Sequence, residues 1–314
     1  MRLPVITTTE IRTYKRCREE HRIQYPLGYR PLRREQPLAF GSVVHAGLEA
    51  WWLTHDPERA LAAARAHEDA AALDVWDMVR AEVMLLGYHA RWIDVAQDWE
   101  TLRVEASFYL LRSGYKLGGK LDALARHRPT GRVAVVEHKT SSEDVSPGSP
   151  YWRRLTLDDQ VGIYVEGGRG LGHHVDLVLY DVLVKPSREP ARATPPESRK
   201  YRKDGALYAN QREHDESPED YRARLLEYVA ERPDEHYRRS EVVRLDHERE
   251  QARRDIDRIA QDILRTIPSE KEPKSPDACK RYGRLCPFFE ACLGEADLDD
   301  IARFRRAFTP HEEL

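Results

Sequence analysis

Long apolar segments are missing from this chain of 314 residues. No run approaches the ~18 consecutive apolar residues that a membrane-spanning helix needs. The N-terminus, MRLPVITTTEIR, lacks the apolar stretch of a signal peptide. Charged residues make up 33% of the sequence. We therefore expect a cytoplasmic protein with a heavily charged surface and no membrane partner.

A strong net charge is missing too. The formal net charge of −3 at pH 7 argues against a protein that binds polyanions with its whole surface. Basic residues gather locally, however, and a groove for nucleic acid can be basic on a molecule that is not. For any single one of them, an ordinary solvated position is the competing interpretation. The candidates for contacts with DNA are Arg12, Lys15, Arg16, Arg18, Arg30, Arg33, Arg34, Arg199, Lys200, Arg202 and Lys203, with Tyr201 and Tyr208 able to stack on bases.

A nucleotide-binding motif is absent as well. No G-x-x-x-x-G-K-[ST] sequence occurs, so the sequence offers no P-loop for a nucleotide-driven motor, and any motor must belong to a partner. The run Gly118-Gly119-Lys120 lacks both the helix and the ending that a phosphate-binding loop requires. Internal repeats, which would indicate a solenoid, do not occur either.

The order of the expected elements favours one mixed α/β (α+β) domain over residues 1–314, in which helices cover a central mixed sheet. Helical periodicity follows Gly41-Ser42 and continues to about 100, and strand-like alternation begins near Thr101. We expect a first helix from Thr7, a helical insertion over 41–100, a catalytic sheet core over 101–185 containing a helix that stops at Gly167-Gly168, a mobile basic loop over 186–216, helices near 218–230 and 246–267, and a short helix in the tail 298–308.

Three ionisable residues punctuate an apolar hairpin between Gly118 and Thr140. If its turn is centred on Pro129-Thr130, paired residues have numbers that sum to 259. Asp122 then lies opposite Glu137, and Lys139 shares their face because side chains alternate along a strand. Like charges placed opposite each other are destabilising. A divalent cation between the two carboxylates would remove that penalty.

Two carboxylates and a lysine on neighbouring strands suit the hydrolysis of phosphodiesters. The carboxylates are the oxygen ligands that Mg²⁺ or Mn²⁺ prefers, the ion polarises phosphate and activates water, and the lysine assists the attacking water. The competing interpretation is a solvated Asp, Glu and Lys on an exposed sheet face, which is the commoner situation for an arbitrary hairpin.

The pattern resembles the PD-(D/E)XK nuclease superfamily, with Asp122 as the first acid and Glu137-His138-Lys139 as the E-x-K. Gly41 to His45 resembles the G-x-x-x-H helix of its RecB-like exonucleases, and Gln160 with Tyr164 resembles their Q-x-x-x-Y. The resemblance implies a restriction-endonuclease-like fold. It also implies that His45 joins Asp122 and Glu137 as a metal ligand, and that Gln160 and Tyr164 position the substrate or the catalytic lysine.

Only four cysteines occur, Cys17, Cys279, Cys286 and Cys292. Disulfides are rare in the cytoplasm, so the choice lies between a metal cluster and unconnected buried thiols. Zinc usually takes pairs spaced C-x₂₋₄-C, which this chain lacks, whereas four thiolates are the usual ligands of a 4Fe–4S cluster. CRISPR-associated and helicase-linked members of the resembled family hold such a cluster with one N-terminal and three C-terminal cysteines. The resemblance therefore implies an iron–sulfur module formed by residue 17 and residues 279–292, with zinc as the alternative.

The sequence thus predicts a metal-dependent deoxyribonuclease, and the resemblance favours an exonuclease that acts on single-stranded DNA or DNA ends. The alternative is a catalytically weak DNA-binding or assembly subunit of a helicase–nuclease or CRISPR adaptation complex. A helicase or a CRISPR or phage recombination protein would be the partner in either case.

Overall fold

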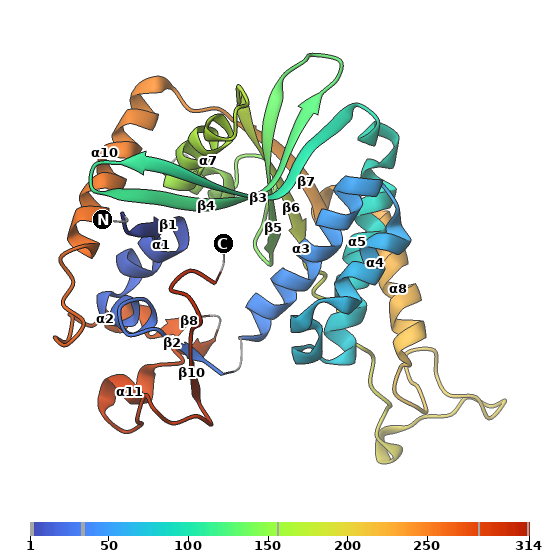
Figure 1. Ribbon diagram of the computed structural model, residues 1–314. Helices are drawn as coiled ribbons and strands as arrows, with labels where there is room; N and C mark the ends of the chain where they lie inside the picture. Colours follow the sequence, from blue (N-terminus) through green and yellow to red (C-terminus); the bar gives the residue numbers. More distant parts are fainter. Residues whose placement is uncertain (1–2, 33–34, 156, 282, 313) are drawn as a thin grey trace.

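A mixed sheet with helices on both faces forms the body of the protein (Figure 1). The computed structural model describes residues 3–32, 35–155, 157–281, 283–312 and 314, so Arg33 and Arg34 lie outside the described residues. Within these residues the main sheet has six strands in the order β1-β4-β5-β6-β7, with β3 paired to β4. Its strands are β1 (Val5–Thr7), β3 (Trp99–Arg112), β4 (Tyr115–His127), β5 (Val133–Ser141), β6 (Leu177–Val184) and β7 (Tyr237–Val242).

Two helical layers cover the sheet. Helices α3, α4, α5 and α8 form one apolar core with the alanine-rich face of β4 and β5, and α1, α7 and α10 form a second core on the other face. The helices are α1 (Thr8–Arg16), α2 (Arg18–Gln24), α3 (Gln36–Thr54), α4 (Pro57–Ala66), α5 (Val75–Ala96), α6 (Pro150–Leu155), α7 (Asp159–Gly170), α8 (Pro218–Glu231), α9 (Pro233–His236), α10 (Asp246–Ile263) and α11 (Phe289–Leu293), with 3₁₀ turns η1 (Glu68–Ala72), η2 (Pro196–Ser198) and η3 (Pro276–Ala278).

The chain ends meet in a small third core. Strand β2 (Tyr29–Pro31) pairs antiparallel with β10 (Phe304–Arg306), and Ile23 and Phe288 are buried beside this pair. A short hairpin, β8 (Lys280–Arg281) and β9 (Arg284–Leu285), lies in the same C-terminal region. No helix in the described residues combines the length and apolar character needed to cross a bilayer.

The predicted mixed α/β fold is confirmed, and three local predictions need correction. The helix expected from Gly41-Ser42 begins at Gln36, because Pro37 occupies the first turn, where its missing N–H costs nothing. Helix α7 continues past Gly167-Gly168 to Gly170. The tail expected as a helix instead forms strand β10, because pairing with β2 outweighs its local helical pattern.

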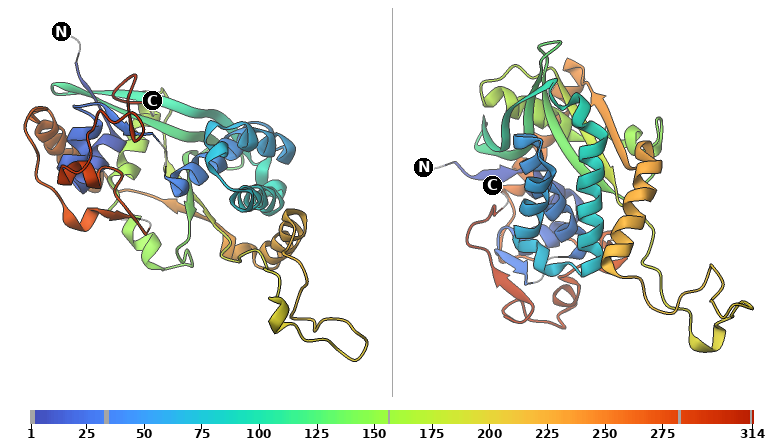
Figure 2. Two further views of the ribbon diagram at one scale, coloured as in Figure 1. Left: turned by 90° about the horizontal axis from the view of Figure 1, so that it is seen from below. Right: turned by 90° about the vertical axis from the view of Figure 1, so that its right-hand side faces the viewer.

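Residues 186–216, expected to form a mobile basic loop, project from the body as a long arm (Figure 2). Antiparallel contacts join the two sides of the arm, among them Thr194 N to Arg212 O at 2.9 Å and Glu216 N to Ala191 O at 2.9 Å. The Glu216 carboxylate also binds Arg224 of α8, which ties the base of the arm to the body. The mobility of the arm stays a prediction.

Helix α7 lies very close to the sheet because Gly167 has no side chain. A Cβ there would lie 2.6 Å from the ring of Phe108, which is buried with 2% of its surface exposed. Since a buried ring has little room to move away, we expect Gly167→Ala to destabilise the protein by roughly 1–3 kcal/mol in urea unfolding.

The matched control lies on the same helix. A Cβ on Gly162 would meet only Ala252, at 3.9 Å. Gly162→Ala is therefore expected to leave the stability unchanged or raise it by up to about 1 kcal/mol, since alanine favours helix. Equal stability of the two variants would contradict this account of how α7 is seated.

Candidate active site

Asp122 lies in a gap between two strands that pair with the same edge of β4. One edge of β4 pairs with β1 at Lys116–Gly118 and with β5 at 123–126, so residues 119–122 lie between the two partners. The β4–β5 pairs, such as Ala123 with Val136, have numbers that sum to 259 as predicted. The ladder stops one residue short of Asp122, and the Asp122 carboxylate instead accepts a 2.8 Å hydrogen bond from the backbone N–H of His138.

Glu137 and Lys139 lie on the face of β5 that Asp122 shares. Glu137 is buried, with 2% of its surface exposed, and the Lys139 ammonium donates to its Oε1 while keeping 30% of its own side chain exposed. The predicted convergence of an acid, a second acid and a lysine is therefore present. At this end of the sheet the lysine is the partner that offsets the buried charge of Glu137.

Helix α7 supplies a second set of contacts to Glu137. The Tyr164 hydroxyl donates to Glu137 Oε1 at 3.3 Å, and Gln160 Nε2 donates to that hydroxyl. Both side chains point inward because they are one helical turn apart on the face of α7 that covers the sheet. The predicted pair thus contacts the second acid rather than the lysine.

His45 reaches the site from α3. Its Nδ1 lies 3.6 Å from Asp122 Oδ1, and 29% of its side chain is exposed. A Cβ on Gly41, one turn earlier, would meet only Thr140, at the ordinary contact distance of 3.5 Å, so the space beside α3 does not require a glycine there. Of the predicted G-x-x-x-H pattern, the histidine is the residue that reaches the site.

The electrostatics of the three groups are coupled. Burial alone would raise the pKa of Asp122, but His45 and Lys139 outweigh it and hold that pKa well below its usual range. Burial lowers and the Asp122 carboxylate raises the pKa of His45, with a net rise. Burial, joined by the charge of Asp122 and opposed by Lys139, raises the pKa of Glu137. Asp122 therefore stays ionised to a lower pH than Glu137 does.

The residues fit a hard divalent cation in chemistry, although they are not preassembled as ligands. Glu137 Oε2 is buried and has no hydrogen-bond partner among the described residues, and a buried carboxylate oxygen without a partner is costly unless something binds it. Within the described part of the chain, no three His, Cys, Asp or Glu side chains form a group ready to hold a metal ion.

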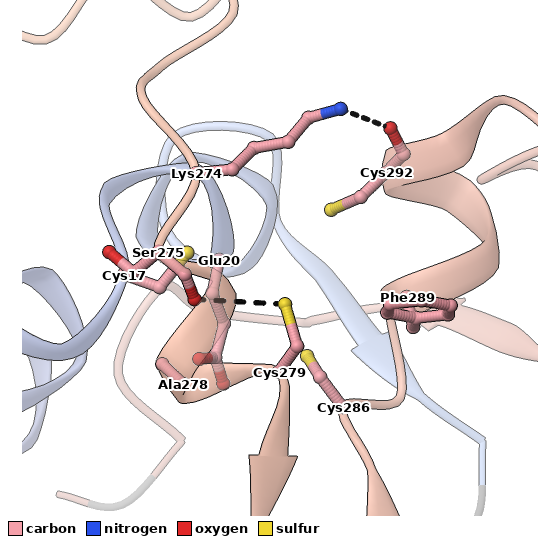
Figure 3. A pocket seen from close by; sticks show the side chains of 9 residues that line it. All are labelled: Cys17, Glu20, Lys274, Ser275, Ala278, Cys279, Cys286, Phe289 and Cys292. Carbon is pink, nitrogen blue, oxygen red and sulfur yellow. Dashed lines mark hydrogen bonds between the residues drawn. The ribbon is translucent and has the colours of Figure 1, made fainter.

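The four cysteines line one pocket between the two ends of the chain (Figure 3). Cys17 ends α1 and precedes α2, and its backbone N–H is bonded to Thr13 O at 2.9 Å. Cys279 follows η3, Cys286 follows the β8–β9 hairpin, and Cys292 lies in α11. The fold therefore brings together thiols that are far apart in the sequence. All four are free cysteines.

Burial makes two of these thiols weaker acids than an ordinary cysteine. It raises the pKa of Cys286 to about 12 and that of Cys292 to about 11. Neighbouring carboxylates add to the effect, Glu20 at Cys286 and Glu19 at Cys292. A metal that took them as thiolates would have to displace their protons.

The predicted DNA-contacting residues divide into two groups. Near the N-terminus, Arg12 pairs with Asp158 at 3.2 Å, Lys15 with Asp159 at 2.8 Å and Arg16 with Glu20 at 2.7 Å. On the arm, Tyr201 and Tyr208 are exposed, at 59% and 50%. Arg199 and Arg202 of the arm also have acidic partners, Glu213 at 3.9 Å and Asp204 at 3.5 Å, so basic residues of both groups form ion pairs within the protein.

One buried acid of this region had no clear signal in the sequence. Asp181, fully buried on β6, receives hydrogen bonds or ion pairs from Tyr88 and Arg239 and lies 3.5 Å from His138 Nδ1, directly behind the E-x-K. Glu105, opposite the level of Asp122 on β3, has a left-handed φ of 45° and pairs with Lys120. Both depend on contacts between strands, which periodicity does not specify.

Comparisons with known proteins identify one family. The sequence profile of the PD-(D/E)XK nuclease superfamily matches residues 5–293. Among solved structures, a "Putative exonuclease" from Eubacterium rectale is similar at 13% identity and a TM-score of 0.49, over 94% of this chain and 90% of that one. The protein SSO0001 is similar at 17% identity and a TM-score of 0.23, over 71% and 84%. No curated protein matches.

Proposed function

The chain belongs to the PD-(D/E)XK nuclease superfamily, and on that premise we propose that it is a metal-dependent DNA exonuclease acting on single strands or DNA ends. One observation supports this most strongly. Asp122, Glu137 and Lys139 converge where β4 and β5 part, and the buried Oε2 of Glu137 has no partner among the described residues.

Each residue has a distinct task in this proposal. His45, Asp122 and Glu137 would hold Mg²⁺ or Mn²⁺, which when bound polarises the phosphate and makes a bound water more acidic. Lys139 keeps its ammonium against Glu137, where it can orient the attacking water and offset the negative charge that grows on the phosphate. Tyr164 and Gln160 hold the Glu137 carboxylate from the side of α7.

The substrate preference can be tested by comparing DNA molecules that have ends with a circular molecule that has none. A linear single strand, its closed circular form, and blunt and recessed duplexes would be incubated with the protein and Mn²⁺. We expect nucleotides to be released from the linear strand and from duplex ends, while the circle stays intact because it has no end. Cutting of the circle at the same rate would show an endonuclease.

DNA contacts outside the site are proposed for the arm. The tyrosines Tyr201 and Tyr208 are exposed there beside Lys200 and Lys203, and an aromatic ring next to basic groups suits the bases and phosphates of a single strand. Binding should then weaken steeply with salt. Arm-deleted protein with an unchanged salt slope would rule this out.

A 4Fe–4S cluster is proposed for the cysteine pocket, with zinc as the alternative. The support is the convergence of Cys17, Cys279, Cys286 and Cys292 on one pocket together with the preference of such clusters for four thiolates. Its role would be structural. Thiols kept for a metal suit a reducing compartment, so the proposal includes a cytoplasmic location.

The competing candidate is a DNA-binding or assembly subunit of a helicase–nuclease, CRISPR or phage recombination complex. It is favoured by the absence, in the described residues, of a ready metal-ligand group. It predicts DNA binding without hydrolysis in every divalent cation, which the same assays distinguish.

A further inference from the structure

We propose that Arg12 is a positioning residue that fixes the direction of a hydrogen-bond relay ending on Glu137. The inference rests on the proposed nuclease function. It adds a residue that lies outside β4, β5, α3 and α7, the four elements that carry the other proposed site residues. Arg12 lies on α1 and donates to Gln160 Oε1, and the relay continues through Tyr164 to Glu137.

The direction of the relay follows from the chemistry of its members. A guanidinium can only donate, so Gln160 must present its amide oxygen to Arg12 and its NH₂ to Tyr164. The tyrosine hydroxyl has a single proton. Because its oxygen already accepts from Gln160, that proton is available to the Glu137 carboxylate, 3.3 Å away.

Without Arg12 the amide of Gln160 can turn over. Its oxygen would then face Tyr164 and compete with Glu137 for the hydroxyl proton. Glu137 is buried and its other oxygen has no partner among the described residues, so its orientation depends strongly on the contacts at Oε1. Loss of the tyrosine proton would leave the second acid held by Lys139 alone.

Helix α1 is tied to both acids' surroundings by its neighbours. The strand before it, β1, pairs with Lys116–Gly118 of β4, the strand that carries Asp122. Two ion pairs join α1 to the start of α7, Arg12 with the N-cap residue Asp158 and Lys15 with Asp159. Helix α1 therefore bridges the strand of the first acid and the helix that contacts the second.

The test compares four single variants in steady-state cleavage of single-stranded DNA. Arg12→Met removes every donor, and we expect kcat to fall roughly ten- to a hundredfold with little change in KM. Arg12→Lys, which also only donates, should recover most of the rate. Gln160→Glu should lose as much as Tyr164→Phe, because a carboxylate at position 160 would accept the tyrosine proton.

A double variant separates the relay from direct DNA contact. In the Tyr164→Phe background, Arg12→Met is expected to cost nothing further, since the relay is already broken. If Arg12 instead binds a phosphate, KM will rise, the salt slope of binding will fall by about one, and the two losses will multiply. Any of these three results overturns the proposal.

A matched control and a readout independent of activity complete the design. Arg91 pairs with Asp234 at 2.9 Å between two helices, so Arg91→Gln removes a similar ion pair and should leave kcat unchanged. The same Arg12 and Tyr164 variants are compared in urea unfolding, where the relay predicts non-additive shifts of the midpoint. Additive shifts of the midpoint would overturn the relay, whether or not the wild-type protein cleaves DNA. A wild-type protein that cleaves no DNA would refute the proposed nuclease function, which is a separate result.

Discussion

Replacing Lys139 with alanine is expected to abolish DNA cleavage, with a loss in turnover of at least about 1,000-fold. Lys139 is the ammonium in contact with Glu137, and its charge is needed where negative charge grows on the phosphate. The measurement is the rate of product formation from end-labelled single-stranded DNA in Mn²⁺. Asp122→Ala is expected to lower the turnover by as much, since it removes one of the two carboxylates of the proposed metal site.

The fold should survive the loss of Lys139. Burial already raises the pKa of Glu137, so the carboxyl can take up a proton when its counter-ion is gone. The control is Lys116→Ala, which removes a lysine from β4 outside the site and should retain full activity. Full activity of a correctly folded Lys139→Ala protein would remove the lysine from the mechanism.

Loss of Cys17 is expected to have the largest effect on stability. A cross-link between residues 17 and 279 closes a loop of about 260 residues, for which chain entropy gives roughly 5 kcal/mol. That is a large share of the roughly 5–15 kcal/mol that stabilises a typical domain. Cys17→Ser should therefore purify without iron and unfold at a much lower urea concentration than the wild type.

The wild-type protein provides the reference for this experiment. Purified without oxygen, it should be coloured and contain iron and acid-labile sulfide in equal amounts, about four of each per chain. If Cys17 were a free thiol outside a metal site, Cys17→Ser would change neither content. A colourless wild-type protein with one zinc per chain would overturn the cluster, and equal stability of both proteins without metal would overturn the entropic argument.

The sequence was sufficient for the register of the catalytic hairpin. Placing the turn at Pro129-Thr130 pairs residues whose numbers sum to 259, as in Ala123 with Val136, and a one-residue shift would move Asp122 away from Glu137. The position of Tyr164 follows in the same way from its helical spacing after Gln160. Burial alone would not have located these residues, because consecutive residues of β5 and of α7 are buried.

The contributions of the chain ends could not be read from periodicity. Strands β1 and β10 have only three residues each, too few for a pattern, and exist because a partner strand is available. Arg12 was expected to face DNA because its sequence neighbours are basic, whereas its partners Asp158 and Gln160 lie almost 150 positions away. Such contacts become visible only once the fold is known.

Cleavage in the presence and absence of metal tests the central claim most directly. Purified protein would be incubated with end-labelled single-stranded DNA in Mn²⁺, in Mg²⁺ and in excess EDTA. We expect short labelled products in both metals, none in EDTA, and recovery when metal is added back. DNA that is bound but remains intact under every condition would contradict a nuclease that uses His45, Asp122, Glu137 and Lys139.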